Sequence, residues 1–290
     1  MRVLWAFDPF RQDKVRTRRM YHLIKAVSGS DIEIGYVANR MDPDLNLAFD
    51  IPHEKRFSSY PWELIKKSLK SAKVPIADQL IHVIDFESFS TTKSVDCFLR
   101  LAQERSADLV TLFTHSRQGL PRFFLGSFAE TAVHRSKVNL LMVNPKSNLP
   151  KRIRRVLFLS DFTDSSTKQL KQVLRMCRNL DAELTIFHAA QFIYKVSLHE
   201  KSPEALSYRR RVDRLKTRFE KLCQTSGVAC QIIINSEFKM VADSALECAR
   251  KKKSDLIVVA AQTGSLSALI GGSITRQVLR SSTKPVLVLK

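Results

Sequence analysis

Long apolar runs are absent from this 290-residue sequence, and no stretch approaches the roughly 18–20 consecutive apolar residues that a membrane-spanning helix needs. The opening residues, MRVLWAFDPF, do not combine a basic leader, an apolar segment and a small-residue cleavage site, as a secretory signal does. We therefore expect a cytoplasmic protein that makes no membrane contact.

Cysteine is sparse and irregularly spaced. The five cysteines are odd in number and form no C-x-x-C motif, and no His/Cys spacing suits a metal ion. Small buried thiols in a reducing compartment are the favoured interpretation. A Walker A lysine loop and an evident general base are also missing. An enzyme is therefore not expected, and any ATP hydrolysis should be slow and incidental.

Acidic residues are too few to balance the basic ones, which gives a formal net charge of +20. The excess is uneven, at +6 for residues 1–150 and +14 for residues 151–290. A basic chain can meet nucleic acid or another polyanion. The basic runs KRIRR (151–155), RRR (209–211) and RKKK (250–253) are, however, separate in sequence and lack interleaved aromatic residues. A solvated basic surface is therefore favoured, and nucleic acid binding is the weaker alternative.

Apolar runs and helical spacings alternate along the chain in the same order twice. The ranges 38–59 and 191–202 show no clear period. Strands are predicted at 2–7, 31–37, 80–84, 109–114 and 139–143, and again at 156–159, 184–189, 230–234, 256–260 and 286–289. Helices are predicted at 14–27, from 62, at 91–106 and at 127–135, and again at 165–180, 203–225, 241–252 and 273–281.

The two halves match each other directly. Asp108-Leu109-Val110 recurs as Asp255-Leu256-Ile257, 147 residues later, and Gly126-Ser127 recurs as Gly272-Ser273, 146 residues later. Strands separated by helices imply a parallel sheet covered on both faces. The predicted fold is therefore α/β, with two tandem open-sheet domains at 1–147 and 152–290, each a five-stranded parallel sheet with helices on both faces.

Glycine is scarce, with eight residues in the chain, yet three of them lie within Val258–Leu279. This stretch has the order strand, glycine loop and helix N-terminus, an arrangement whose backbone N–H groups can hold phosphate. In an open α/β sheet the ligand lies beyond the carboxyl ends of the strands, where the strand order reverses. Asp161, at the end of the first strand of the second half, is expected to meet the glycine loop there.

At these residues the sequence resembles the universal stress protein family, over nearly all of its length and as two tandem domains. In that family, the fourth strand runs into G-x-x-G, then nine residues, then G-S/T at the start of the last helix. The resemblance implies an adenine nucleotide alpha-hydrolase-like fold and, in ATP-binding members, phosphates held at these glycines. It also implies an Asp on the adenine side and backbone contacts at the end of the second strand.

In the second half the family pattern is recognisable but irregular. Asp161 matches the Asp of the first strand, and Ala189 falls at the end of the second strand, after the family's common His, here His188. Ala261 replaces the first glycine, the second is Gly264, and only seven residues separate it from Gly272-Ser273. The resemblance implies an ATP site, with or without Mg, formed by these residues: Asp161, Ala189, Ala261, Gly264, Gly272 and Ser273.

In the first half the pattern is degenerate. Phe113 stands in place of the first glycine and Ser116 in place of the second, although Gly126-Ser127 is retained. Asp8 still follows the first strand, and Val37 ends the second. A large ring at Phe113 would obstruct the approach of the backbone to the ribose. We therefore expect this half to have lost ordinary ATP binding.

Structural explanations compete with each of these assignments. The role of Asp161 could be limited to capping the next helix. The role of Gly272-Ser273 could be limited to starting a helix, because Ser is a common N-cap. Gly264 and Gly271 could serve turn geometry alone. His115 and His188 are interpreted as structural, since neither accompanies a nucleophile in a recognisable motif.

Two functions follow from the sequence. The first is a stress-response protein that binds ATP or another adenine nucleotide in its C-terminal domain, as a ligand or signal. The alternative is an interaction or scaffold protein that binds no ATP, because both glycine patterns depart from the family. In either case the resemblance implies an intramolecular pseudo-dimer through the last strand of each domain, at 140–143 and 285–289.

Overall fold

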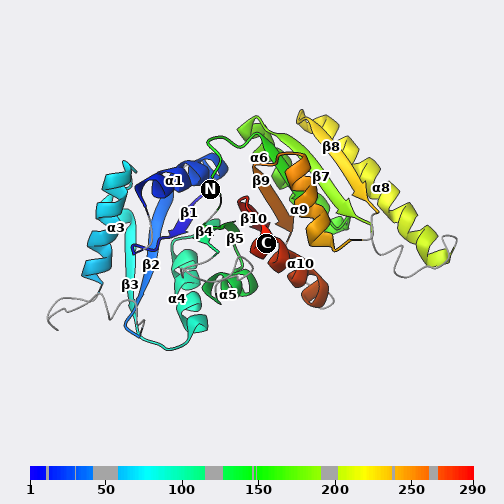
Figure 1. The fold of residues 1–290 in the computed structure, drawn as a ribbon. Coiled ribbons are helices and arrows are strands. Elements are labelled where there is room, and N and C mark those ends of the chain that lie inside the picture. The colour runs from blue at the N-terminus through cyan, green and yellow to red at the C-terminus, as the bar shows by residue number, and fades with distance from the viewer. Residues whose placement is uncertain are drawn as a thin grey trace. The chain divides into compact units, whose positions relative to one another are not determined.

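The computed structural model describes two compact units, Met1–Lys151 and Arg152–Lys290. The described residues are 1–10, 13–29, 31–41, 58–114, 127–145, 147, 149–190, 202–236, 239–260 and 267–290, without the side chains of 204, 205 and 267–273. The predicted loop 38–59 and the stretch 191–202 therefore fall largely outside the described residues. Each unit is an α/β domain, as predicted (Figure 1).

Unit 1 alternates strands and helices as the sequence indicates. The structure confirms helix α5 and strand β5 to the residue and places most other boundaries within one or two residues of the prediction. In chain order, its elements are β1 (Val3–Ala6), α1 (Lys14–Ser28), β2 (Ile32–Asn39), α3 (Ser59–Ala72), the 3-10 turn η1 (Asp78–Leu80), β3 (Ile81–Phe86), α4 (Thr91–Glu104), β4 (Leu109–Phe113), α5 (Ser127–Arg135) and β5 (Asn139–Val143).

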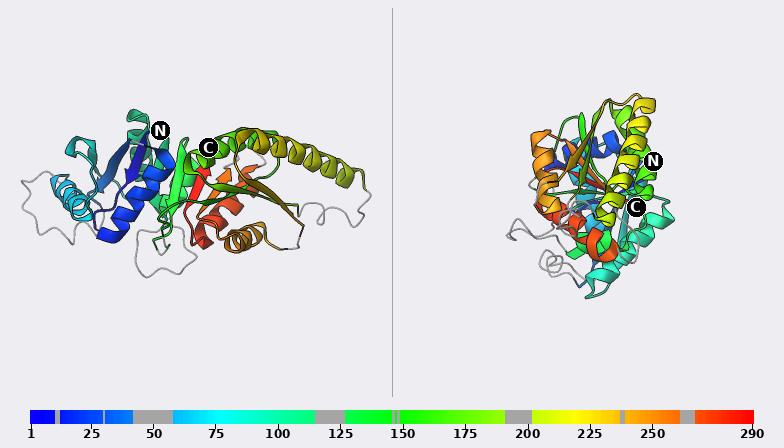
Figure 2. Two further views of the ribbon diagram at one scale, coloured as in Figure 1. Left: turned by 90° about the horizontal axis from the view of Figure 1, so that it is seen from above. Right: turned by 90° about the vertical axis from the view of Figure 1, so that its right-hand side faces the viewer.

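Unit 2 repeats the same order, and Figure 2 shows its long helix α8 lying along strand β8. Its elements are β6 (Arg155–Leu159), α6 (Asp164–Leu180), β7 (Glu183–Ala189), α8 (Pro203–Ser226), β8 (Cys230–Asn235), α9 (Val241–Lys251), β9 (Leu256–Ala260), α10 (Ser267–Ser281) and β10 (Val286–Leu289).

The start of the last helix was predicted wrongly. Helix α10 begins at Ser267, six residues before the predicted start at Ser273. The sequence Ser267-Ala268-Leu269-Ile270 supplies a turn of residues that a helix accepts, and interior glycines are tolerated at a cost of about 1 kcal/mol each. Gly272 and Ser273 therefore lie inside the helix and do not open it.

All strand pairs within each unit are parallel. The strand order is β3-β2-β1-β4-β5 in unit 1 and β8-β7-β6-β9-β10 in unit 2. Helices α1 and α3 pack together, as do α4 and α5, and unit 2 has the matching pairs α6 with α8 and α9 with α10. The order reverses between the first and fourth strands of each unit. In open α/β sheets, ligands bind beyond the carboxyl ends of the strands at such a point.

The repeat extends to single hydrogen bonds at the opposite, amino-terminal edge of each sheet. Asp108 Oδ2 accepts from the Arg2 N–H (2.9 Å), and the Asp108 N–H donates to the Arg2 carbonyl (2.9 Å). In unit 2, Asp255 Oδ2 accepts from the N–H groups of Arg154 (2.9 Å) and Arg155 (3.0 Å). The recurring Asp therefore fixes the first strand against the fourth.

At one position in the core, the large and the small side chain lie on opposite elements in the two repeats. A Cβ built on Gly35 of β2 would lie 2.8 Å from Phe98 Cε2 of α4, so the ring of Phe98 fills the space of a missing side chain. The corresponding residues of unit 2, from the strand registers and helix sequences, are Phe187 and Ala245, both buried. The large residue therefore lies on the helix in unit 1 and on the strand in unit 2, and this helix packs on this strand in both units.

We expect Gly35→Ala to lower the free energy of unfolding by about 1–3 kcal/mol, because the added methyl group overpacks the core. In a Phe98→Ala background the same substitution should cost much less, because the obstructing ring is gone. Urea unfolding of the four proteins in this cycle measures both costs. Equal costs in the two backgrounds would contradict the packing account.

Candidate functional site

The candidate site of unit 2 lies where β6 and β9 end side by side. Leu159, the last residue of β6, pairs with Val259 of β9, and the Ser160 N–H donates to the Phe187 carbonyl of β7 (2.9 Å). Asp161 therefore follows the central strand, and Ala189 ends the neighbouring strand β7. These two predicted residues are brought to the same edge of the sheet.

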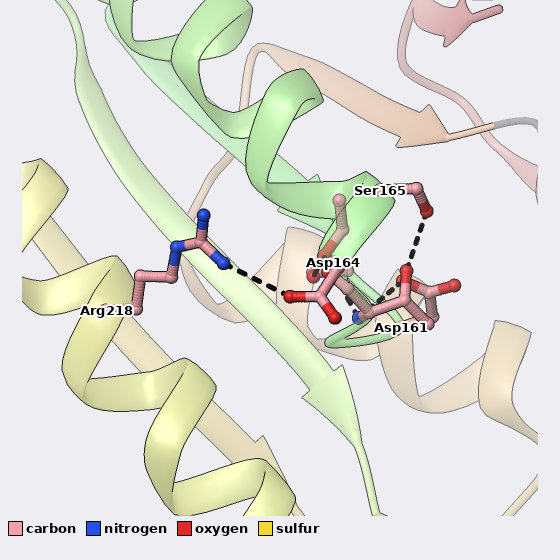
Figure 3. A network of polar contacts seen from close by, with 7 residues as sticks. Asp161, Asp164, Ser165 and Arg218 are labelled. Atoms are coloured by element: carbon pink, nitrogen blue, oxygen red, sulfur yellow. Dashed lines mark hydrogen bonds and ion pairs between the residues drawn. The ribbon is translucent and has the colours of Figure 1, made fainter.

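The two carboxylate oxygens of Asp161 have different surroundings. Oδ1 accepts from the N–H (3.2 Å) and the hydroxyl (2.8 Å) of Thr163. Oδ2 is buried and has no hydrogen-bond partner in the part of the chain that the structure describes. Figure 3 shows this carboxylate beside the first turn of α6. Asp161 thus offers an unused acceptor at the switch point.

Capping does not account for Asp161. The N-cap of α6 is Thr163, whose N–H donates to Ser166 Oγ (3.2 Å). At the start of the helix, Asp164 also accepts from Arg218 of α8 (3.1 Å; Figure 3). Asp161 supports the N-cap residue through one oxygen only, so the helix start leaves Oδ2 unexplained.

A strained loop presents Asp161. Phe162 has φ 49°, a left-handed conformation that is uncommon for residues other than glycine. Its N–H donates to Ser160 Oγ (3.1 Å), and this hydroxyl in turn donates to Ser166 Oγ (3.2 Å). Such strain persists only where neighbouring groups hold it, and it is common at ligand sites.

His188 of β7 is the main support of this loop. Because the Ser160 carbonyl can only accept, Nδ1 carries the proton and donates to it (2.9 Å), and Nε2 accepts from the Tyr208 hydroxyl of α8 (2.8 Å). The imidazole also stacks on the Phe162 ring, with centroids 4.5 Å apart. His188 therefore links β7, the Asp161 loop and α8, which agrees with its interpretation as structural.

Burial keeps this histidine neutral. His188 is 4% exposed, and desolvation lowers its pKa below the usual value. The Ser160 carbonyl and Asp161 oppose this shift, and the nearby Arg211 adds to it. A neutral ring is the form that can both donate to Ser160 and accept from Tyr208.

The predicted phosphate side is only partly described. Ala261 and Gly264 lie outside the described residues, although Ala260, which precedes them, ends β9 next to β6. Gly272 and Ser273 belong to α10, and their side chains are not described. The predicted meeting of Asp161 with the glycine loop therefore stays a prediction.

The corresponding position in unit 1 differs in the residues that support the loop. The Asp8 carboxylate accepts from the Phe10 N–H (3.0 Å), as Asp161 does from Thr163. Strand register aligns Pro9 with Phe162, however, and the proline ring fixes φ near −65°. Phe7 and Tyr36 likewise replace Ser160 and His188. Unit 1 therefore lacks the side chains that hold the strained loop.

One alignment within unit 1 needs correction. Leu109–Phe113 pairs with β1 as Leu256–Ala260 pairs with β6, so Phe113 corresponds to Ala260 and Thr114 to Ala261. Phe113 is the last residue of the strand and does not replace the first loop glycine, because the ladder fixes the register. Val37 lies within β2 and Ser127 starts α5, whereas Ser116 and Gly126 fall outside the described residues.

Comparison with known proteins identifies the repeat. The model of the universal stress protein family matches residues 1–144 and 152–290. The chain belongs to the universal stress protein family. Each half is one universal stress protein domain, and the recognition from sequence is confirmed. A search of curated proteins gave no match.

Solved structures share the tandem fold. A universal stress protein from Archaeoglobus fulgidus DSM 4304 is 18% identical, with a TM-score of 0.68 over 99% of this chain and 96% of its own. A functionally unknown protein from Pseudomonas aeruginosa PAO1 is 17% identical, with a TM-score of 0.61 over 100% and 92% of the two chains. At these identities, the comparisons establish the fold.

Two further searches of the described residues bear on function. No group of three or more His, Cys, Asp or Glu side chains among them could hold a metal ion. In the same part of the universal stress protein chain, no helix combines the length and apolarity needed to cross a membrane.

The lowered pKa of His188 predicts a pH-dependent stability. As the pH falls, the unfolded chain, with a histidine pKa of about 6.5, binds the proton before the folded protein does. The contribution of His188 to the free energy of unfolding is therefore fully present above about pH 6.5 and decreases below it. His188→Gln should remove this slope, which reaches at most about 1.4 kcal/mol per pH unit. Urea unfolding between pH 5 and 8 tests it.

The matched control is His22→Gln, at an exposed position of α1. This variant should keep the pH dependence of the unsubstituted protein. If the free energies of unfolding of His188→Gln and His22→Gln depend on pH in the same way, burial of a neutral His188 does not cause the pH dependence of stability.

Proposed function

We propose that this universal stress protein binds an adenine nucleotide in unit 2 and acts as a stress-response protein whose ligand is a signal. The crevice beyond β6 and β9 holds the nucleotide. Asp161 contacts its adenosine end, together with backbone at Ala189. ATP is the proposed ligand, with or without Mg.

The observation that carries this proposal is the buried Oδ2 of Asp161. Burying a carboxylate oxygen without a donor is costly, and native proteins rarely leave such an atom unsatisfied. The adenine amino group and the ribose hydroxyls are donors of the right kind. A nucleotide that donates to Oδ2 would satisfy this atom, while Oδ1 stays bonded to Thr163.

The phosphate end of the proposal rests on the sequence. The family pattern assigns the ribose and phosphates to Ala261, Gly264, Gly272 and Ser273. Because α10 begins at Ser267, its backbone N–H groups without a helical partner belong to residues 267–270. Phosphates held at this helix end would still lie next to the loop that contains Gly264.

The loop supports favour unit 2 over unit 1. The strained Phe162 and its supports, Ser160 and His188, hold Asp161 in place before a ligand arrives. Pro9, Phe7 and Tyr36 occupy the same positions in unit 1, so Asp8 lacks those supports. We therefore propose one nucleotide per chain, bound as a ligand, with hydrolysis slow and incidental.

The alternative is an ATP-independent interaction or scaffold protein, in which both sites are degenerate. Its support is the incomplete glycine pattern of both halves, together with the apolar last strands β5 and β10.

We propose that these two strands pair within one chain as a pseudo-dimer, because an unpaired strand edge invites association. Slow amide hydrogen exchange along both strands is expected, and fast exchange in either would rule the pairing out.

Asp161→Asn tests the nucleotide site directly. The substitution keeps an acceptor at Oδ1 for Thr163 but turns the Oδ2 position into a donor, which repels the donors of adenosine. Equilibrium titration calorimetry should show ATP binding that is weaker by at least about tenfold, or 1.4 kcal/mol.

Asp8→Asn is the matched control, because it makes the same change in unit 1. It should leave ATP affinity unchanged. No heat from the unsubstituted protein at millimolar ATP would sink the nucleotide proposal and leave the scaffold alternative. Equal losses in the two variants would contradict the assignment to unit 2.

A further inference from the structure

Two basic runs that are far apart in the sequence meet at one edge of unit 2. Residues 152–155 lead into β6, and residues 250–255 lead from α9 into the neighbouring strand β9. Asp255 Oδ2 accepts from the N–H groups of Arg154 and Arg155, which are 101 and 100 residues away in the sequence. Two of the three basic runs that are separate in the sequence therefore lie side by side in the fold, whereas 209–211 belongs to α8.

Most cations at this edge are exposed and unpaired. We call the set Arg152, Arg154, Arg155, Arg250 and Lys253 the basic edge; all five are exposed. Their side chains have no ion pair or hydrogen bond to another side chain within the described parts of the chain. Two adjacent lysines differ, because Lys251 pairs with Glu247 (2.9 Å) and Lys252 donates to Gln231 (2.6 Å).

The fold itself does not require this charge. At the C-terminal end of α4 and just after it, unit 1 has Gln103 where unit 2 has Arg250, and Ser106 where unit 2 has Lys253. Ser106 and Lys253 share the same left-handed φ of 50°. Unit 1 keeps Arg2 and Arg105 at the positions of Arg155 and Lys252, but it has no cationic side chain at those of Arg154, Arg250 and Lys253. A helix C-terminus favours cations in both units alike, so the helix dipole does not explain why unit 2 carries more positive charge here.

We propose that the basic edge binds the phosphodiester backbone of nucleic acid. Four of its five residues are arginines, whose planar guanidinium groups suit phosphate oxygens. A membrane surface fits less well, because stable membrane binding uses apolar anchors. None of the exposed large hydrophobic residues among the described residues falls in 152–155 or 250–255.

The basic edge is separate from the nucleotide site. It lies at the amino-terminal ends of β6 and β9, whereas Asp161 lies beyond the carboxyl end of β6. Nucleic acid binding therefore does not depend on the proposed nucleotide. The two proposals can fail independently.

The test measures binding of the full chain to fluorescent single-stranded RNA and single-stranded DNA of one sequence over a range of salt. The edge variant Arg154→Gln/Arg250→Gln/Lys253→Ser takes two of its residues from the same turn of unit 1. It should bind about tenfold more weakly at low salt. The slope of log affinity against log salt concentration is negative, and its magnitude should decrease by about 2, because each of the three lost phosphate contacts contributes about 0.7.

The matched control removes three exposed cations from helices of unit 1, through Arg18→Gln/Lys67→Gln/Lys70→Gln. Both variants have a net charge of +17 instead of +20. The control should keep the salt slope of the unsubstituted protein. The variant Arg154→Lys/Arg250→Lys should also keep the salt slope, because it retains the charge. It shows whether substitution at these positions weakens binding through loss of charge or through disturbance of the fold.

The RNA and DNA arms show which polymer the edge prefers, and similar affinities point to the shared backbone. Equal losses in the edge variant and the control would mean that only bulk charge acts, and would overturn the proposal. Binding to vesicles of anionic phospholipid without binding to either nucleic acid would overturn it as well.

Discussion

Pairing of the first strand with the fourth is the constraint on which both units depend. This parallel ladder joins segments about a hundred residues apart, and an Asp at its amino-terminal end fixes it in each unit. Strand order reverses at this ladder, so the chain diverges beyond its carboxyl end and leaves room for a ligand. The same ladder places Asp161 at one edge and collects the basic residues at the other.

The two repeats keep this ladder while their sites diverge. Both retain the Asp after the first strand and the turn it makes with the residue two positions later. Unit 2 adds a left-handed Phe162, held by the Ser160 hydroxyl and the neutral His188. A proline at the same position in unit 1 cannot adopt that conformation. Duplication thus conserved the scaffold and left the support of one site free to change.

The strands and most helices could be predicted because their apolar residues repeat with a regular period, and the repeat could be seen in recurring residues such as Asp108 and Asp255. The start of α10 could not, because the glycine pair was interpreted as a break although the preceding Ser267–Ile270 continues the helix. Phe113 was misaligned by one residue because strand register depends on the neighbouring strand.

At the candidate site, Asp161 and Ala189 were predictable from their places at strand ends. The supports were not, because Ser160 and Tyr208 lie 28 and 20 residues from His188, and no motif links them. The basic edge was hidden for the same reason, since its parts meet only when β6 lies beside β9. Short-range patterns find elements, whereas contacts between distant segments require the fold.

Crystals of the full chain grown with a non-hydrolysable ATP analogue test the central claim most directly. The account predicts one nucleotide per chain, in unit 2, with an adenosine donor within hydrogen-bond distance of Asp161 Oδ2. Electron density for the analogue at Asp8, or no density beside Asp161 at a saturating concentration, would contradict it.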